Sequence, residues 1–437
     1  MICINSLNIY GKLPVLNIYI GVVIMKVNPS HNGWLLEYLE YRKIIFQSFL
    51  ADTATDSHPE HSMYRLLQSS GIMYGHPIGV KDNDLTKLNK LKLLMAESLI
   101  SGSLIYHHQE INNEDDFSNV IMRTVSKIGD FYNKVYPELS VSNRTFLGQK
   151  KSPLEIAEKI LEKRVLKTVC HSEEFWVSFF ENIIIFLDIY FFGRWMHTSS
   201  EKMIAEFFQQ EKEELRFSIV KVMSAAAHAN KNIEEEEESL FNFFLKSSHL
   251  TSEQKEEAKK TFDKGINISD IYIPSHNSWL LKKFFLELAI LTVWVDRKLE
   301  DSEIVFLKAF TKKLGFYEEN LDDSLLAVEG FILENWNQLN DLQSGHILEE
   351  LSSEYLKKIK ITTDRNALRI NNELKNNKKI SQLLLKSRDE KLTVDEEDLL
   401  HKELINVLKA VPTFVIIGLP TSYLTLPMLL KILPNKC

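Results

Sequence analysis

Apolar side chains recur at spacings of three and four residues along most of this chain, which is the pattern of helices with one buried face. The first such stretch begins near Trp34, and the pattern returns at Leu88–Tyr106 and at Phe117–Val135. The polar stretch Ser142–Ser152 then interrupts it. The pattern therefore predicts an N-terminal helical region, 25–150, that ends in a linker.

The most apolar stretch in the middle of the chain is Phe175–Trp195, which is long enough to raise the question of a membrane span. It contains Glu181 and Asp188, and each acid would cost roughly 2.5–3.5 kcal/mol at mid-bilayer. The two acids are seven residues apart and so share a helix face. We therefore expect an amphipathic helix buried in a bundle, within a region of amphipathic helices at 151–199. A membrane span is the less favoured alternative.

A repeat with an offset of 66 residues follows, in which Ala229–Glu237 aligns without a gap on Val295–Glu303. Apolar positions on both sides of the turn align as well, so each copy predicts an apolar helix, a polar turn and a second apolar helix. Acids gather at the start of each second helix, where the helix dipole favours negative charge. Two such hairpins packed together would bury what each alone exposes.

This arrangement resembles the TerB-like helical domain linked to tellurite resistance, over residues 200–335. That family carries an Ala-Asp-Gly turn, an apolar residue and a glutamate in each half, and the acids near the turn are associated with metal binding. The resemblance implies a divalent cation as ligand, whereas helix-start acids that only interact with the dipole need none. Lys231 and Arg297 replace the turn glycine, and the ligand pattern of an EF-hand is absent from the sequence. The candidate metal ligands are Asp296, Glu300, Glu303, Glu234 and Glu237.

Residues 336–390 are charged and rich in Lys and Asn. Apolar residues between Leu348 and Ser387 show no clean heptad, so we expect a charged helical arm or a weak coiled coil. Two short basic runs, Lys357–Lys360 and Lys378–Lys379, have acids nearby. A solvated helix face explains them better than a nucleic-acid site.

The C-terminal region, 391–437, starts with a helix-capping pattern and then carries twenty residues without a charge, Val411–Leu430. An apolar helix of that length covers a bilayer core of about 30 Å. Prolines recur in it at nearly regular intervals, and a helix kinked in lipid would present the carbonyls that they free to a partner. The residues that mark this predicted membrane segment are Pro412, Gly418, Pro420, Tyr423, Pro427, Lys431 and Pro434.

From Leu392 to Asn435 this proline pattern resembles the LETM family of mitochondrial inner-membrane proteins. That family is linked to potassium/proton or calcium/proton exchange, and to ribosome contact through a domain after the span. Tyr423 stands where the family usually has an acid, which argues against exchange because ionisable groups inside membranes mark ion pathways. The chain stops at Cys437, so the ribosome-contacting domain is expected to be missing and ribosome contact is not expected. The regions together resemble a bacterial family described as LETM-related and biofilm-associated.

Composition narrows the fold class and the compartment. Gly and Pro number only 15 and 11 among 437 residues, which favours long helices over a β fold. A net charge of -8 makes nucleic acid a poor candidate partner. Cys3, Cys170 and Cys437 are too far apart in the sequence for a disulfide framework or a zinc motif, so we expect a reducing compartment. Met1–Ile24 is expected to be an extension without a folded role, with Met25 as the more natural start; a signal anchor is the alternative.

Patterns of known catalytic loops, such as the Walker loop, the nucleophile elbow and the zinc-protease helix, do not occur in the sequence. We therefore expect a protein that is not an enzyme and that holds no organic cofactor. The predicted fold is an all-α multi-helix bundle with a repeated helical hairpin and a proline-kinked membrane helix at its C-terminus.

The leading functional hypothesis is a scaffold or accessory protein anchored in the bacterial inner membrane, with its body in the cytoplasm. Its proline-kinked face would allow it to form a homo-oligomer. One alternative is an oligomeric cation/proton exchanger, since a single span cannot form a pathway alone. The other is a metal-binding stress module whose C-terminal helix packs on its own body.

Overall fold

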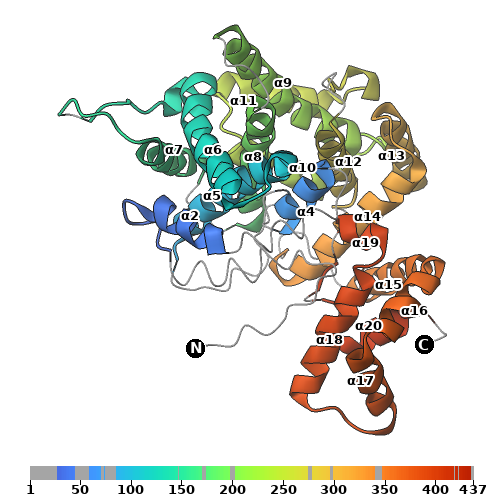
Figure 1. The fold of residues 1–437 in the computed structure, drawn as a ribbon. Helices are drawn as coiled ribbons and strands as arrows, with labels where there is room; N and C mark the ends of the chain where they lie inside the picture. Colours follow the sequence, from blue (N-terminus) through green and yellow to red (C-terminus); the bar gives the residue numbers. More distant parts are fainter. Residues whose placement is uncertain are drawn as a thin grey trace. The chain divides into compact units, whose positions relative to one another are not determined.

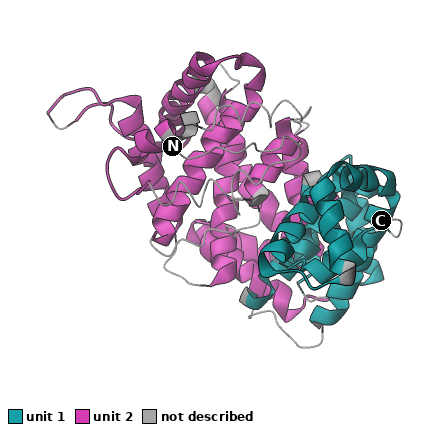
Figure 2. Ribbon diagram, turned by 60° about the horizontal axis from the view of Figure 1, so that its bottom comes forward, with its two compact units in different colours: residues 1–12, 289–437 teal, residues 13–288 magenta. Residues whose placement is uncertain are grey.

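The computed structural model describes residues 27–44, 59–69, 73, 85–145, 147–169, 174–196, 202–273, 278–295, 299–339, 347–417, 419–421 and 423–434. Within these residues the fold is all-α, as the sequence predicts, and it has no β-strand beyond an isolated bridge between Arg144 and Lys150. The predicted extension Met1–Ile24, together with Asp296 and Gly418, lies outside the described residues. The chain divides into two compact units: unit 2 spans 13–288, and unit 1 comprises 1–12 and 289–437 (Figure 2).

Unit 2 is built around α8 (Phe175–Met196), whose side chains are buried on nearly every side. α5 and α10 pack on α8, and α6 packs on both α5 and α7 (Figure 1). Aromatic rings fill the spaces between them; Phe180 meets Phe244 of α10 with ring centroids 5.4 Å apart. The other helices of this unit are α2 (Trp34–Ile44), α4 (Pro59–Ser69), α5 (Lys87–Tyr106), α6 (Glu114–Val135), α7 (Pro153–Thr168), α9 (Lys202–Ala227), α10 (Glu235–Ser247) and α11 (Ser252–Lys264).

α8 is buried in a bundle, as expected, but the prediction that it is amphipathic is wrong, because its side chains are buried on nearly every side. Among the described residues it is the one helix long and apolar enough to cross a membrane, and 94% of its most apolar window is buried within the structure. The core helix of a folded protein meets the same criteria of length and composition, so α8 is weak evidence for a span. Its acids, Glu181 and Asp188, are buried and do not form an exposed polar face.

Unit 1 begins inside α12 (Trp279–Val293) and holds the C-terminal third of the chain. α14 packs on α13, α15 and α19, while α20 packs on α15 and α18. The stretch expected to form a charged arm is therefore part of a packed unit. The helices of unit 1 are α13 (Asp301–Lys313), α14 (Glu318–Asn335), α15 (Ile347–Arg365), α16 (Ala367–Asn376), α17 (Lys378–Asp389), α18 (Val394–Leu408), α19 (Pro412–Ile417) and α20 (Leu426–Ile432).

The 66-residue repeat is preserved in the helix boundaries. α9 ends at Ala227 and α12 ends at Val293, and the bounds of α10 and α13 differ by the same offset. α11 and α14 also begin 66 residues apart, at Ser252 and Glu318. The repeat is therefore longer than the predicted hairpin, since it includes the start of a third helix. Its first copy lies in unit 2, whereas the turn and later helices of the second copy lie in unit 1.

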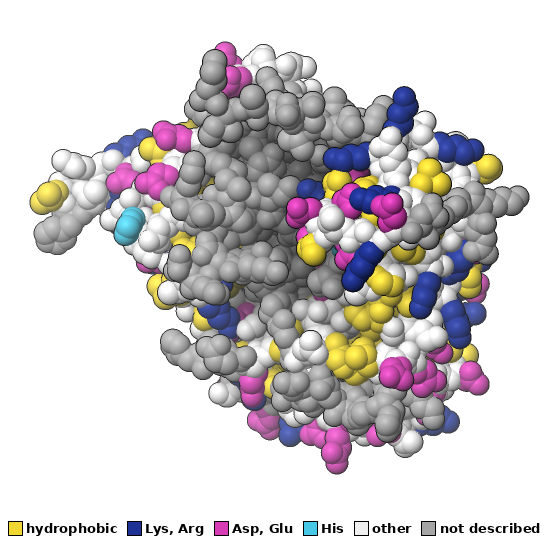
Figure 3. All heavy atoms as spheres, turned by 90° about the horizontal axis from the view of Figure 1, so that it is seen from below, with side chains coloured by type: hydrophobic (Ala, Val, Ile, Leu, Met, Phe, Trp, Pro, Cys, Tyr) yellow, Lys and Arg dark blue, Asp and Glu magenta, His cyan; other side chains and the backbone are white. Residues whose placement is uncertain are grey.

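The surface charge of unit 1 is uneven. Between residues 357 and 386 the sequence has nine Lys or Arg and two acids, although the whole chain has a net charge of -8. Figure 3 shows basic, hydrophobic and some acidic side chains next to one another on the right-hand part of the drawn face, the side on which Figure 1 draws α15, α16 and α17. The acids of this stretch are Asp364 and Glu373.

Candidate functional site

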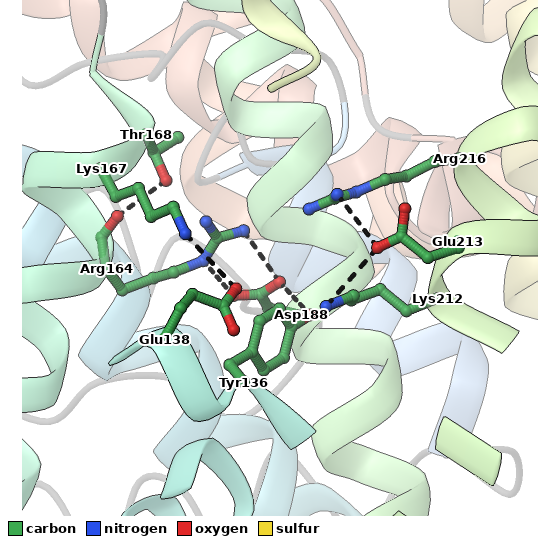
Figure 4. Close-up of polar contacts among 9 residues, drawn as sticks. All are labelled: Tyr136, Glu138, Arg164, Lys167, Thr168, Asp188, Lys212, Glu213 and Arg216. Atoms are coloured by element: carbon green, nitrogen blue, oxygen red, sulfur yellow. Dashed lines mark hydrogen bonds and ion pairs between the residues drawn. The ribbon is translucent and has the colours of Figure 1, made fainter. Parts of the chain in front are cut away.

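Asp188 of α8 is the centre of a buried polar cluster in unit 2 (Figure 4). Its Oδ2 accepts hydrogen bonds from the hydroxyl of Tyr132 at 2.9 Å and from Nε of Arg164 at 2.5 Å. Its Oδ1 accepts from the hydroxyl of Tyr136 at 2.5 Å and from Nη2 of Arg164 at 3.0 Å. The ion pair is bidentate, a geometry that fixes the guanidinium relative to the carboxylate.

Local sequence signals set the helices that carry these partners. α6, which holds Tyr132, starts after Asn113, whose side chain accepts a hydrogen bond from the backbone of Asp116 at 2.9 Å. α7, which holds Arg164, starts with a capping box between Ser152 and Glu155. Both caps satisfy backbone donors that a helix start leaves free, so they fix where each helix begins.

Burial and charge set the protonation states in the cluster. Burial raises the pKa of the Tyr132 and Tyr136 hydroxyls well above their ordinary value, and the negative charge of Asp188 raises them further. Burial alone would lower the pKa of Arg164, but the adjacent Asp188 raises it above its usual range. Arg164 is therefore a charged guanidinium, and Tyr132 and Tyr136 are neutral phenols, across the physiological pH range.

A second layer of charges lies around the central pair (Figure 4). Lys212 of α9 lies 4.3 Å from the ring centroid of Tyr136, and its pKa is lowered by burial and by the nearby Arg216. Glu213 lies 3.6 Å from Nζ of Lys212 and 3.3 Å from Nη1 of Arg216. These charges extend the network from α6, α7 and α8 to α9.

The arrangement suits a structural role better than a catalytic one. All four strong acceptor positions of the Asp188 carboxylate are filled by protein donors, so a substrate would have to displace one of them. The network joins side chains from α6, α7 and α8 and so fixes the register of these helices. The sequence pointed to Asp188, because an acid stands out in an apolar helix, but nothing in it identified Tyr132 or Arg164 as partners.

No known protein family, curated protein or solved structure matches this chain. The site can therefore be interpreted only from its own residues.

Glu97 of α5 is a second buried carboxyl in unit 2. Burial raises its pKa to about 7, although a hydrogen bond from Ser101 acts in the opposite direction. The Ser101 hydroxyl donates to Oε1 of Glu97 at 2.6 Å. Its protonation therefore changes near neutral pH, which makes unit 2 sensitive to pH at this position.

The acids of the repeat act as helix caps. The backbone N–H of Glu234 donates to Oε2 of Glu237 at 3.1 Å, and that of Glu300 donates to Oε2 of Glu303 at 2.8 Å. Both pairs form capping boxes at the starts of α10 and α13, and Glu237 and Glu303 are buried. The part of the chain that the structure describes contains no group of three or more His, Cys, Asp or Glu residues able to hold a metal. Asp296, the remaining metal candidate, lies outside that part.

One turn position of the first copy has left-handed backbone without a glycine. Lys231 has a φ of 69°, a conformation that favours glycine. His249 has a φ of 53° and stands 66 residues before Gly315, whose φ is 73°. Gly315 ends α13 in a Schellman motif, in which the N–H of Phe316 donates to the carbonyl of Thr311 at 3.0 Å. The first copy thus uses Lys and His in a backbone conformation that glycine adopts without strain.

The predicted C-terminal membrane helix is not a continuous helix. The uncharged run forms two short helices, α19 and α20, separated by residues 418–425. Proline lacks the N–H that continues a helix, and its ring clashes with the preceding turn. Pro412 and Pro427 accordingly lie at the helix starts, and Pro420 lies in the connection between them. Many apolar side chains of the run are buried within unit 1: Val411, Phe414, Ile417, Leu419, Leu424 and Leu429.

Side chains of unit 1 form hydrogen bonds with backbone carbonyl oxygens near these prolines. The Thr363 hydroxyl lies 2.6 Å from the carbonyl oxygen of Ile432, and Nε2 of His401 lies 2.6 Å from that of Leu424. Nη1 of Arg369 donates to the carbonyl of Ala410 at 3.3 Å. We refer to these three contacts as the carbonyl contacts. The predicted seam of open carbonyls is thus at least partly satisfied within the same unit.

The remaining marked residues have different surroundings. Tyr423 is partly exposed, and its hydroxyl donates to the Ser352 hydroxyl of α15. Pro412, Pro427 and Lys431 are exposed, whereas Pro420 and Pro434 are buried. Tyr423 therefore makes a hydrogen bond that holds the C-terminal segment to α15.

Proposed function

We propose that this protein is a non-catalytic helical scaffold of the LETM-related type that works at the bacterial inner membrane, with its body in the cytoplasm. The observation that carries the scaffold is the buried Asp188, which accepts hydrogen bonds from four protein donors. The folding of the uncharged C-terminal run into unit 1 bears on how such a scaffold would attach. Attachment would then be peripheral, through the surface of that unit, and would not use a spanning helix.

The use of the ionisable side chains supports a scaffold. Asp188 binds four protein donors, and the glutamates of the repeat cap helices. Groups engaged in this way stabilise one arrangement of helices, which is what a platform for other molecules needs.

The same geometry favours a scaffold over an oligomeric exchanger. Tyr423 stands where the LETM resemblance places an acid, and its hydroxyl is bonded to Ser352. The segment that would have to line a pathway is packed against α14, α15 and α18. An exchanger would require this segment to leave unit 1.

Cell fractionation tests the proposal. Membranes from cells that produce the full chain should contain the protein, and alkaline carbonate should release it, because carbonate removes peripheral but not spanning proteins. Recovery of all the protein in the soluble fraction would contradict the proposal. Resistance to carbonate would instead favour a spanning segment. The full chain must be used, since a chain ending at Lys409 loses α19 and α20 and with them part of the core of unit 1.

A further inference from the structure

The outer surface of α15, α16 and α17 combines positive charge with exposed aliphatic side chains. α16 contacts both α15 and α17, and single residues, Asn366 and Asn377, separate the three helices. Nine of the residues between 357 and 386 are basic and two are acidic. We call the exposed basic and large aliphatic side chains of this stretch the basic face: Lys357, Ile361, Arg365, Leu368, Arg369, Lys375, Lys378, Lys379 and Leu385. Asp364 is the exposed acid of the stretch, and Glu349, Glu350 and Glu354 are exposed at the start of α15.

Helical spacing places the two kinds of side chain on the same side. On α16, Leu368 and Lys375 are seven residues apart and both are exposed. On α17, Lys378 and Leu385 have the same spacing and are also exposed. The opposite sides of the two helices supply buried residues to the unit, among them Ile370, Leu374, Ile380 and Leu383.

The aliphatic side chains on this face are unusually open to solvent. Leu368 is 84% exposed, Leu385 59% and Ile361 52%. Large aliphatic side chains between lysines are typical of helices that lie in the headgroup region of a membrane, where the chains enter the acyl boundary and the cations meet anionic lipid.

We propose that the basic face binds the anionic surface of a phospholipid bilayer. Its Lys and Arg side chains contact lipid phosphates, while Leu368, Leu385 and Ile361 enter the edge of the acyl layer. This inference rests on the proposed function and names the surface through which the scaffold would attach. Single-stranded nucleic acid fits less well, because its bases stack on aromatic rings and the exposed large side chains of this face are aliphatic.

Vesicle flotation with the purified full chain tests the inference. The protein should float with phosphatidylcholine vesicles that contain phosphatidylglycerol and should not float with phosphatidylcholine alone. Binding should weaken as salt rises from low to physiological concentration, because salt screens the attraction between lysines and lipid phosphates.

A charge reversal at the start of α17 tests the role of the lysines. Lys378→Glu/Lys379→Glu should lower partition into anionic vesicles roughly tenfold or more, since each basic side chain near such a surface contributes to binding. The variant should keep its fold, because acids are favoured in the first turn of a helix. The matched control is Lys259→Glu/Lys260→Glu on α11, an adjacent pair of exposed lysines in unit 2 with the same change in net charge.

A second pair of variants tests the aliphatic side chains. Leu368→Ser/Leu385→Ser should also weaken flotation several-fold, because it removes apolar groups from the acyl boundary. Leu147→Ser/Leu166→Ser is the control, since these leucines in unit 2 have nearly the same exposure, 82% and 57%. Thermal melting followed by circular dichroism should show the same transition for all four variants and the original chain.

Three outcomes would overturn the inference. The first is the absence of flotation with phosphatidylglycerol vesicles. The second is an equal loss of binding in the control variants, which would indicate a response to net charge alone. The third is tighter binding to a single-stranded oligonucleotide than to vesicles, with no effect of the leucine substitutions. If the chain sediments with cell membranes in all variants, the basic face is wrong while the proposed scaffold stands; if it never does, the proposed function fails.

Discussion

The two units hold buried polar groups in different ways. In unit 2 the ion pair between Asp188 and Arg164 is buried among helices, and the hydroxyls of Tyr132 and Tyr136 also donate to Asp188. In unit 1 the carbonyl contacts join the side chains of Thr363, His401 and Arg369 to backbone oxygens near prolines. A buried charge depends on every partner at once, whereas each carbonyl contact acts locally. We therefore expect substitutions in unit 2 to have the larger effects.

Asp188→Asn should have the largest effect on stability. The change keeps the shape of the side chain but leaves the Arg164 guanidinium buried without its counter-charge, and the expected loss is about 3–5 kcal/mol in the free energy of unfolding. Urea denaturation followed by circular dichroism measures it. Glu213→Gln, which removes a partly exposed acid from the outer layer, should cost less than about 1 kcal/mol. Similar losses in the free energy of unfolding for both variants would contradict the prediction that the buried ion pair contributes more stability than the charges around it.

Glu97→Gln should have the next largest effect, and it should depend on pH. The pKa of Glu97 in the folded protein, about 7, is above its ordinary value of 4.5. Between these values the folded state binds more protons than the unfolded state, so stability falls as pH rises through this window. The free energy of unfolding therefore falls by on the order of 3 kcal/mol in total across this window, and the loss is complete above pH 7.

Melting temperatures measured from pH 4.5 to 8 test this prediction. The original chain should lose stability along the series more steeply than Glu97→Gln, which has no proton to release and should be the more stable protein at pH 8. Glu155, whose pKa is lowered by the backbone and side chain of Ser152, should not contribute to the slope of this series, because it would titrate below pH 4.5. Parallel curves for the original chain and the Glu97 variant would show that this carboxyl does not titrate in the window.

Thr363→Val should have a smaller effect, confined to unit 1. The substitution keeps the volume of the side chain but removes its hydrogen bond to the buried Ile432 carbonyl, at an expected cost of about 1–3 kcal/mol. Thr362→Val is the control, because the hydroxyl of Thr362 donates to the carbonyl of Lys358 in its own helix and its removal leaves the C-terminal segment untouched. Hydrogen exchange should report faster exchange in α20 for the first variant alone.

Lys231→Gly should have the smallest effect, and it should be a gain. Glycine adopts the left-handed backbone without the strain that a side chain causes, so we expect a stabilisation of roughly 0.5–1 kcal/mol. Lys259→Gly, in the middle of α11, should instead destabilise by about 1 kcal/mol. A loss at Lys231 would indicate that its side chain makes a contact worth more than the backbone strain.

Much of the fold could be predicted from apolar spacing and from acids that stand out against it. The apolar residues predicted the helix α8. The acids among them indicated where it lies, because buried charges are rare and therefore informative. The 66-residue offset located α10 and α13, since capping acids mark helix starts directly. These signals lie within short stretches of sequence, so they can be interpreted without knowing which residues pack against each helix.

The C-terminal segment and the partners of Asp188 could not be predicted in the same way. An uncharged run of twenty residues has the same composition whether it crosses a bilayer or fills the core of a unit. Contacts with residues outside the run, among them Thr363 and His401, distinguish the two cases. Tyr132 and Arg164 likewise have no sequence feature that separates them from other tyrosines and arginines. Contacts between distant residues decide these cases, and periodicity does not record them.

The equal spacing of the repeated helices has a consequence for how this chain can be altered. Since every helix boundary from the end of α9 to the start of α11 returns 66 residues later, the turns of one copy have the same length as those of the other. Residues 228–251 and 294–317 are thus equal in length, and each contains a turn, a helix and a second turn. A chimaera that carries either segment twice keeps the number of residues between the flanking helices unchanged.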